Sequence, residues 1–559
     1  MKRTVITSLG ITLISFISAF FCILPQQASA VAPTKFNIYF GGALGHNYSS
    51  NQASVVPVSN LTVEVGDTII WTGDFSSDPL HFTSVPAGAQ AAGPITSGTS
   101  FLYVIEAAGT YSYQNDTYAQ LGMKGAITAV FKSHGSITNE GREFYLGMLY
   151  PSYMHIASST LFRELAFYAI ITSYYDNVIN YSYFDANGTE LPPTKKIMGA
   201  KERFQFNLSQ PAMRLDSFPE QPIYRAMHIT SKYPISVQYL SRAANSGGSY
   251  LSLPVMGLGK KYVVSSYNDD AGNGALVNRT GLPKTAEPAG GCFIVIATEN
   301  TTNVNITPNA KTSTGKSKGV PFSVGLSKGQ CYFVRSDGNN ADNDISGSVV
   351  ESNKPIVVIA GHEDAYIGDV SGSSTEGRDL MIEQMLPVEF WDSVGYIGMP
   401  MVSSTGTASG GVGDGYRVYT YDPGQAKVQA DIGNIAGGYD LSVSKFGVAE
   451  HYDIIDKADI YSTNGHKISV MQYDERTQPN KPPLSAPAMT TIIPHSRWRT
   501  AYNFSEFDPG GISGVNASQY VGIISDSSLN GIKISINGAA EQTIPTTGFI
   551  NKLSFANLS

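Results

Sequence analysis

The segment SGSVVESNKPIVVIAG, residues 346–361, decides the fold class of this chain. It predicts a strand, a short polar turn and a second strand, and the unbroken apolar run at 356–360 is typical of a strand that is buried on both faces. The same pattern occurs at 227–240, MHITSKYPISVQYL, and at 460–473, IYSTNGHKISVMQY. A hairpin that occurs three times predicts a repeated β module.

A second recurring hairpin marks the period of the repeat. Its first strands begin at Phe167, Phe293, Tyr416 and Tyr520, and its second strands lie at 178–181, 304–307, 427–430 and 532–536. Each of the first three modules then closes with a segment that runs from a Leu-Pro or Ile-Pro pair to a tyrosine, at 253–267, 386–396 and 493–502. We therefore expect three full modules and the opening of a fourth. Each has six or seven strands, which suits either a small β-sandwich or more than one blade of a propeller.

The composition agrees with an all-β protein of several domains. A chain of 559 residues is too long for one core. Its 32 tyrosines fit half-buried pleated surfaces and its 56 glycines fit many turns. Charged residues make up only 15% and the formal charge is −8, which excludes the basic surface that a nucleic-acid-binding protein needs.

Residues 1–30 have the features of a secretory signal peptide. Lys2 and Arg3 form a charged start, 11–25 supply an apolar core, and an Ala-Ser-Ala cleavage site ends at Ala30. No later apolar run approaches the ~20 residues that a membrane-spanning helix needs. We expect an exported protein, either secreted or held at the cell surface, without a transmembrane segment.

The expected export of the protein affects whether its cysteines form a disulfide. Cys22 lies within the signal, so Cys292 and Cys331 remain. They either pair in an oxidising compartment or serve as small buried hydrophobes, and the spacing allows both.

Four motifs in residues 31–133 occur in a characteristic order. They are GDTIIW at 66–71, His81, GTYSY at 109–113 and LGMKGAI at 121–127. This order resembles the cupredoxin (plastocyanin-like) family. The resemblance implies a Greek-key β-sandwich over 31–133.

The resemblance also locates the family's copper ligands, and half of them are missing. A blue-copper site needs a Cys thiolate, two imidazoles and usually an axial Met. His81 and Met123 match two ligands, but Asn115 stands at the Cys position and Tyr118 at the second His position. We predict no blue-copper site and no bound cofactor. The alternative is a weak, non-blue metal site that uses His81 and His46.

Residues 141–559 carry a second resemblance. Its blocks are GREFYLG at 141–147, HITSKYPISVQYL at 228–240, SNKPIVVIAGHE at 352–363 and DLMIEQMLPVEFW at 379–391. Over about 141–503 the chain is similar to the IgGFc-binding protein N-terminal domain family. This resemblance implies an extracellular β-rich binding or adhesion segment. The family often has a Cys where this chain has Arg378, so a disulfide at that point is absent.

Two polar clusters are weaker candidates for a site. Asp337, Asp342 and Asp344 lie in a Gly/Asn-rich loop that either binds Ca²⁺ or is simply solvated. His362, Glu363 and Asp379 lie near the end of a buried strand and suit either a hydrolytic site or structural contacts. The sequence contains no HExxH zinc pattern and no GxSxG nucleophile elbow.

The function that fits these features is binding or adhesion without catalysis. We expect exposed tyrosine-rich loops to contact an extracellular protein or glycan. The alternatives are a cupredoxin-type electron carrier and an extracellular hydrolase with a site in the repeat region.

Overall fold

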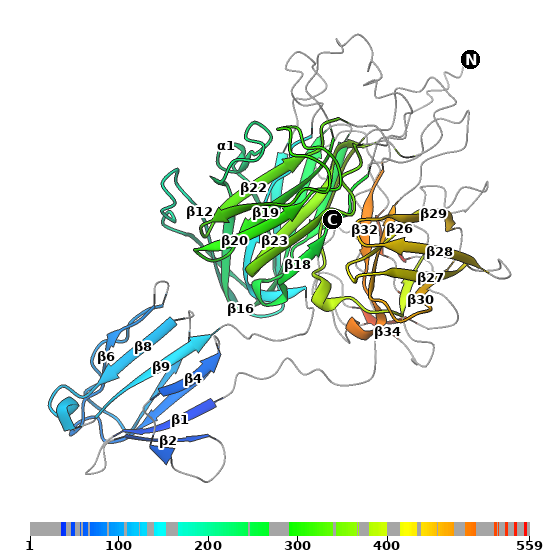
Figure 1. Cartoon of the computed structure of the whole chain (residues 1–559). Coiled ribbons are helices and arrows are strands. Elements are labelled where there is room, and N and C mark those ends of the chain that lie inside the picture. The colour runs from blue at the N-terminus through cyan, green and yellow to red at the C-terminus, as the bar shows by residue number, and fades with distance from the viewer. Residues whose placement is uncertain are drawn as a thin grey trace, which may run out of the picture.

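In the computed structural model nearly all of the regular secondary structure is β-strand, which confirms the all-β prediction (Figure 1). It describes residues 35–40, 46–130, 139–151, 166–267, 290–399 and 414–498, with short gaps inside these ranges, and isolated strands from 519 to 555. The signal peptide expected at 1–30 lies outside the described residues. Within the part of the chain that the structure describes, no helix combines the length and apolar character that crossing a bilayer requires.

The N-terminal part is a sandwich of two sheets around its own core. One sheet has the order β3 (Val56–Pro57), β2 (His46–Ser50), β1 (Lys35–Phe40), β5 (Thr68–Thr72) and β7 (Ser100–Val104). The other has the order β4 (Asn60–Glu64), β9 (Lys124–Val130), β8 (Gly109–Gln114) and β6 (His81–Ser84). Trp71, Tyr111 and Ile127 are fully buried between them. Two pairs, β1 with β5 and β4 with β9, are parallel.

Three modules follow, and each is a sandwich of two sheets, which we call sheet A and sheet B. In the first module, sheet A has the order β10 (Glu140–Leu146), the first half of β16 (Met227–Ala243), β12 (Asn177–Tyr183) and β13 (Thr194–Met198). Sheet B has the order β14 (Arg203–Asn207), β11 (Ala166–Ser173), the second half of β16 and β17 (Ser246–Leu251). A short helix, α1 (Gln210–Met213), follows β14.

The second module repeats this order. Sheet A contains β18 (Gly259–Val263), the first half of β23 (Val349–Ala365), β20 (Thr302–Thr307) and β21 (Phe322–Leu326). Sheet B contains β22 (Gln330–Arg335), β19 (Gly291–Ala297), the second half of β23 and β24 (Asp379–Gln384), with β15 (Ile223–Tyr224) added at the β22 edge.

The third module has the same plan. Sheet A contains β25 (Tyr396–Gly398), β30 (Ala458–Ser462), β27 (Gln425–Ile432) and β28 (Tyr439–Ser444). Sheet B contains β29 (Ala449–Ile454), β26 (Asp414–Thr420), β31 (Ile468–Tyr473) and β32 (Met489–Ile492). Beyond it, β33 (Gln519–Val521) pairs with β36 (Leu553–Phe555), and β34 (Ile532–Ile534) pairs with β35 (Gln542–Ile544). These pairs correspond to β19–β22 and β20–β21 of the second module. The repeats are therefore sandwiches and not propeller blades.

The predicted hairpins are wrong, although their strands are in the expected places. β16 and β23 are single 17-residue strands that pass from sheet A to sheet B of their module. In β23 the pairing with β18 jumps from Glu351 to Ile356, so the strand bends at the predicted turn. Pro355 lies in this bend, where its missing N–H removes no ladder hydrogen bond. In the third module the same segment is divided into β30 and β31, which lie in different sheets.

The strands that mark the period of the repeat also lie in different sheets and do not pair with each other. β11 and β12 lie in opposite sheets of the first module, as do β19 and β20 in the second and β26 and β27 in the third. Each marker pair therefore crosses between the sheets and does not form a hairpin.

The first strand of a module comes from the segment that closes the module before it. Each closing segment contains a proline followed by a 3₁₀ turn: η4 (Val255–Gly257), η6 (Val388–Phe390) and η7 (His495–Arg497). After η4 the chain enters β18, which pairs with β23 of the second module, and the Tyr262 hydroxyl donates to the Ile356 carbonyl at 2.6 Å. After η6 it enters β25, and the Tyr396 hydroxyl donates to the Ile468 carbonyl of the third module. The closing segment of one module thus supplies the first strand of the next module.

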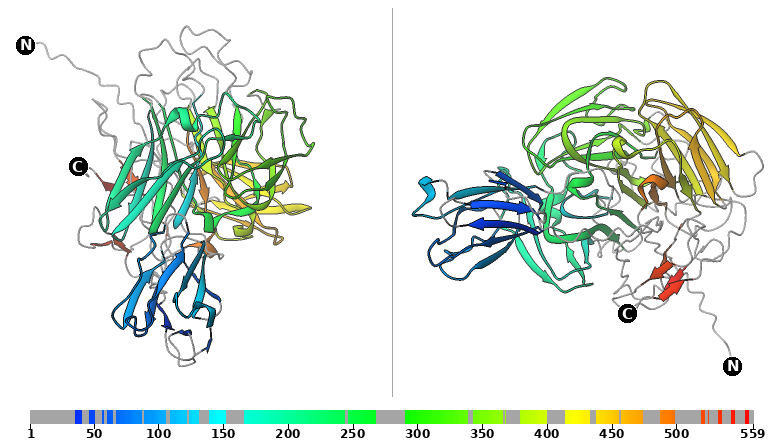
Figure 2. Two further views of the ribbon diagram at one scale, coloured as in Figure 1. Left: turned by 90° about the vertical axis from the view of Figure 1, so that its left-hand side faces the viewer. Right: turned by 90° about the horizontal axis from the view of Figure 1, so that it is seen from below.

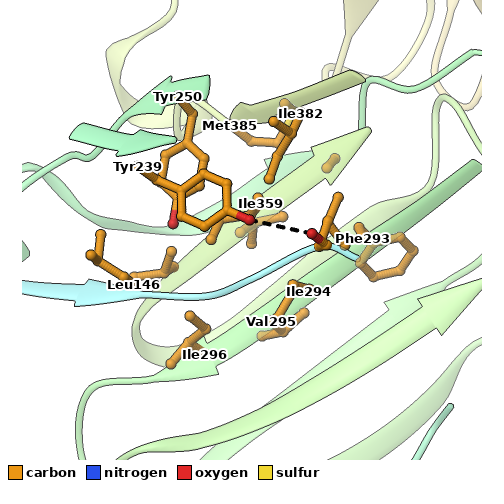
Figure 3. Packing of buried hydrophobic residues seen from close by; sticks show 14 of the residues in the cluster. Leu146, Tyr239, Tyr250, Phe293, Ile294, Val295, Ile296, Ile359, Ile382 and Met385 are labelled. Carbon is orange, nitrogen blue, oxygen red and sulfur yellow. Dashed lines mark hydrogen bonds between the residues drawn. The ribbon is translucent and has the colours of Figure 1, made fainter. Parts of the chain in front are cut away.

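One hydrophobic core runs through the first two modules and into the third, and the modules follow one another in an arc (Figure 2). Figure 3 shows the junction of the first two modules, where Tyr239 and Tyr250 lie next to Ile359 and Ile382. The two tyrosine rings stack with their centroids 4.9 Å apart, and the Tyr250 hydroxyl donates to the Gly147 carbonyl at 2.9 Å. Continuous apolar packing of this kind holds the modules together.

We expect Gly361→Ala to destabilise the second module. Gly361 lies in β23, and a Cβ there would lie 1.9 Å from the Met381 carbonyl oxygen of β24, so the two strands would have to separate. Such overpacking costs about 1–3 kcal/mol and should lower the midpoint of urea unfolding. Gly93→Ala is the matched control, because no heavy atom lies within 4 Å of its added Cβ. Equal losses in both variants would contradict this account of strand approach.

Candidate functional site

The four positions that the sequence resemblance predicted as ligand positions, His81, Asn115, Tyr118 and Met123, lie at one end of the N-terminal sandwich. His81 of β6 is paired with Gln114 of β8, which directly precedes Asn115. The Asn115 amide donates to the Met123 carbonyl at 2.9 Å, and the Met123 amide donates to the Tyr118 carbonyl at 3.2 Å. The structure thus brings His81 of β6 next to the loop that carries Asn115, Tyr118 and Met123.

The side chains at this loop make protein contacts. His81 Nδ1 lies 3.0 Å from Asp116 Oδ2. Asn115 is buried, and its side-chain oxygen accepts the amides of Thr117 and Tyr118 at 2.9 and 3.0 Å. Asn115 therefore shapes the turn that follows β8. Among the described residues, no three His, Cys, Asp or Glu side chains are arranged to hold a metal ion. The side chain of His46 is not among the described residues.

Of the two alternatives for Cys292 and Cys331, the structure has the one without a disulfide. Both thiols are free and buried. On the β19–β22 ladder Cys292 lies opposite Arg335 and Cys331 lies opposite Ile296. This four-residue offset separates the two by roughly 13 Å, well beyond the ~7 Å limit between Cα atoms in a disulfide. Burial raises the pKa of the Cys331 thiol to about 12 and that of Cys292 well above its usual value.

The residues of the hydrolase alternative are buried inside the second module. Both carboxylate oxygens of Glu363 accept from the Arg335 guanidinium at 2.6 Å, and Glu363 is fully buried. His362 is also fully buried, and its Nδ1 accepts the Asp364 amide at 3.1 Å. Asp379 accepts the Leu380 amide at 2.7 Å and the Gly247 amide of the first module at 3.0 Å. These contacts support the fold.

The proposed calcium loop is also occupied by protein cations. The Lys311 ammonium lies 2.5 Å from an Asp337 oxygen. Asp344 accepts from the Arg417 guanidinium at 2.9 Å, and Asp342 lies outside the described residues.

Arg417 is a residue that the sequence did not indicate. It lies on β26 of the third module, is buried, and its guanidinium bonds to Asp344 and to the Ser266 carbonyl of the second module. Its Nε donates to Glu450 at 2.8 Å, and the guanidinium carbon lies 4.1 Å from the Tyr267 ring centroid. This cation holds the second and third modules together.

The best candidate for an external contact is a group of three tyrosines at one end of the first module, which we call the tip cluster: Tyr174, Tyr175 and Tyr233. The ring centroids of Tyr174 and Tyr175 are 5.3 Å apart, and those of Tyr175 and Tyr233 are 5.7 Å apart. Tyr174 is 56% exposed. The Lys201 and Lys232 ammonium groups lie over the outer two rings, at 5.6 and 5.5 Å from their centroids. The cluster presents aromatic faces beside two cations.

A buried asparagine fixes this cluster in place. Asn177 joins the β11–β12 turn to the bend of β16, because its amide nitrogen donates to the Tyr233 carbonyl at 3.0 Å and its oxygen accepts the Tyr233 amide at 3.1 Å. Ser173 and Ser231 donate to the Tyr175 and Tyr233 carbonyls, each at 2.7 Å. These hydrogen bonds therefore hold the β11–β12 turn and the bend of β16 in place without a bound partner. The sequence indicated tyrosine-rich loops but not which of them meet in space.

We expect Arg335→Met to destabilise the second module strongly. The change leaves the Glu363 carboxylate buried without its cation, which typically costs about 3–5 kcal/mol. The double variant Arg335→Met/Glu363→Leu should regain most of this loss, because it removes both charges. Urea unfolding of the wild type and both variants measures the difference. A double variant less stable than the single one would contradict this prediction.

Comparison with known proteins gives one family and several distant structures. The family model described as "IgGFc binding protein" matches residues 248–559. No curated protein matches the chain. Among solved structures, plastocyanin from Dryopteris crassirhizoma is 20% identical and a purple cupredoxin from Nitrosopumilus maritimus is 24% identical. Each match covers 17% of this chain and 99% of the other, with a TM-score of 0.13.

The multicopper oxidase Fet3p, which functions in iron import, is 9% identical over 59% of this chain and 87% of its own, also with a TM-score of 0.13. At such TM-scores none of these structures assigns a fold or a function. The family match covers more than half of the 559 residues. The chain therefore belongs to the IgGFc binding protein family.

Proposed function

We propose that the chain is an exported binding protein that contacts an extracellular protein or glycan and catalyses no reaction. The tip cluster is the observation that carries this proposal. Membership of the IgGFc binding protein family supports it, as do the signal-peptide features of residues 1–30. On this proposal residues 31–133 form a cupredoxin-like sandwich without electron-transfer chemistry, and 141–559 form the binding platform.

The physical case rests on what exposed tyrosines contribute to an interface. A tyrosine offers a large contact area while only two side-chain torsions become ordered on binding. The Asn177 hydrogen bonds already fix the loops that carry Tyr174 and Tyr233, so little further ordering is required. Lys201 and Lys232 add charge-assisted donors at the rim. Rigid aromatic groups of this kind are the usual energetic centres of protein interfaces.

We expect the double variant Tyr174→Ala/Tyr233→Ala to weaken binding at least tenfold, or about 1.4 kcal/mol. The probes are immobilised IgG Fc and a glycan array, tested with the chain lacking residues 1–30. Tyr39→Ala is the matched control, because Tyr39 is 46% exposed but lies on the N-terminal sandwich.

Two results would contradict the proposal. One is that no probe is retained by the wild-type chain. The other is that the Tyr39 variant loses as much affinity as the tip-cluster variant, because the contact would then not depend on the tip cluster.

A further inference from the structure

A histidine lies between two carboxylates where the first module meets the second. His228 is on the first half of β16, and its Nδ1 lies 2.5 Å from a Glu190 oxygen. Its Nε2 lies 2.9 Å from a Glu143 oxygen. The Tyr145 ring stacks on the imidazole with centroids 4.5 Å apart. His228 and Tyr145 are buried.

The second module completes this cluster. The Lys328 ammonium, between β21 and β22, donates to the second Glu190 oxygen at 3.1 Å. The Tyr145 hydroxyl lies 3.5 Å from the Thr298 carbonyl that follows β19. Nearby, Phe184 of the first module packs against Gly329, where an added Cβ would lie 2.6 Å from its ring. Charged and apolar contacts thus cross the junction together.

The chemistry of imidazole makes this arrangement depend on one proton. A neutral imidazole has one N–H donor and one acceptor nitrogen, whereas the imidazolium ion has two donors. A carboxylate only accepts. Both ring nitrogens of His228 face carboxylates, so only the imidazolium donates to Glu143 and Glu190 at once. The same Glu190 oxygen also accepts from the Ser182 hydroxyl at 2.6 Å. Loss of the proton leaves one partly buried carboxylate facing a lone pair.

We propose that His228, held between Glu143 and Glu190, is a proton-controlled lock on the junction between the first and second modules. The protonated ring keeps the Glu190–Lys328 bridge in place. Deprotonation releases one carboxylate and loosens the junction. This lock does not depend on the identity of the binding partner.

The way in which the stability of the junction depends on pH follows from the pKa shifts of His228 and Glu190. Burial lowers the pKa of His228, but the hydrogen bonds and charges of Glu143 and Glu190 outweigh it, and the pKa rises above 6.5. The stabilisation from His228 is therefore complete below about pH 6.5 and is lost as the pH rises through the raised value. Burial raises the pKa of Glu190, but His228, Ser182 and Lys328 lower it further, below 4.5. That contribution is present above about pH 4.5 and is lost only in strong acid.

The other ionisable groups that face His228 do not reverse the direction of this pH dependence. Burial and then the Glu143 charge raise the pKa of Tyr145 above 10, so its hydroxyl stays neutral. Glu299 of the second module acts on Tyr145 from a distance, and its carboxylate is paired with Lys354 at 3.3 Å. Lys328 supplies the positive charge that bridges to Glu190. The junction is tightest in mildly acidic solution.

Hydrogen exchange of the chain lacking residues 1–30 tests the lock. After correction for intrinsic rates, amides at 184–191 and 327–330 should exchange about tenfold faster at pH 9 than at pH 5.5. In His228→Gln this difference should vanish, because glutamine does not titrate. In Glu190→Gln, which keeps the shape of the side chain, it should shrink. His495→Gln, in the third module, should retain the wild-type difference.

An unchanged corrected rate in the wild type would overturn the proposal, and so would a full pH difference in His228→Gln. If circular dichroism shows that His228→Gln does not fold, the Glu190→Gln variant is used to test the proposal instead. A wild-type pH response in that variant would then overturn the lock.

Discussion

The first two modules each depend on one strand whose backbone must be paired in two different sheets. The first half of β23 lies between β18 and β20, and the second half lies between β19 and β24. A buried backbone N–H or C=O without a partner costs as much as a lost hydrogen bond. Both halves therefore need neighbours on both sides. The bend before Ile356 makes this feasible, because it turns the strand from one layer to the other.

This requirement explains why the junctions between modules are so well ordered. The neighbour that β23 needs in sheet A is β18, which the first module supplies after η4. Modules joined this closely bury polar groups where they meet, so cations and carboxylates are paired across the seams. Arg417 bonds to Asp344 at one seam, and Lys328 bonds to Glu190 at the other. On the proposed function, the binding surface lies on loops at the ends of the sandwiches, where Tyr174 is exposed.

Local patterns in the sequence predicted the strands but not their pairing. The apolar run at 356–360 is buried throughout, as expected for a central strand. The turn-like SNKP segment has the composition of a hairpin, and only the choice of sheets shows that it is a bend. Contacts that join distant residues were not predictable: His228 lies 85 positions from Glu143, and Arg417 lies 73 from Asp344. By contrast, the positions at Asn115, Tyr118 and Met123 lie within one loop, so motif spacing was enough to place them together.

The sharing of strands across module boundaries also sets the unit in which such a repeat can be duplicated. A copied gene segment that runs from η4 to η6 carries β18 through β24, which form a complete sandwich. A segment cut at β19 would begin without β18, and its sheet A would lack a border strand. A copy with its breakpoints at the proline turns therefore keeps β18 to β24 together with their pairing partners in one continuous segment.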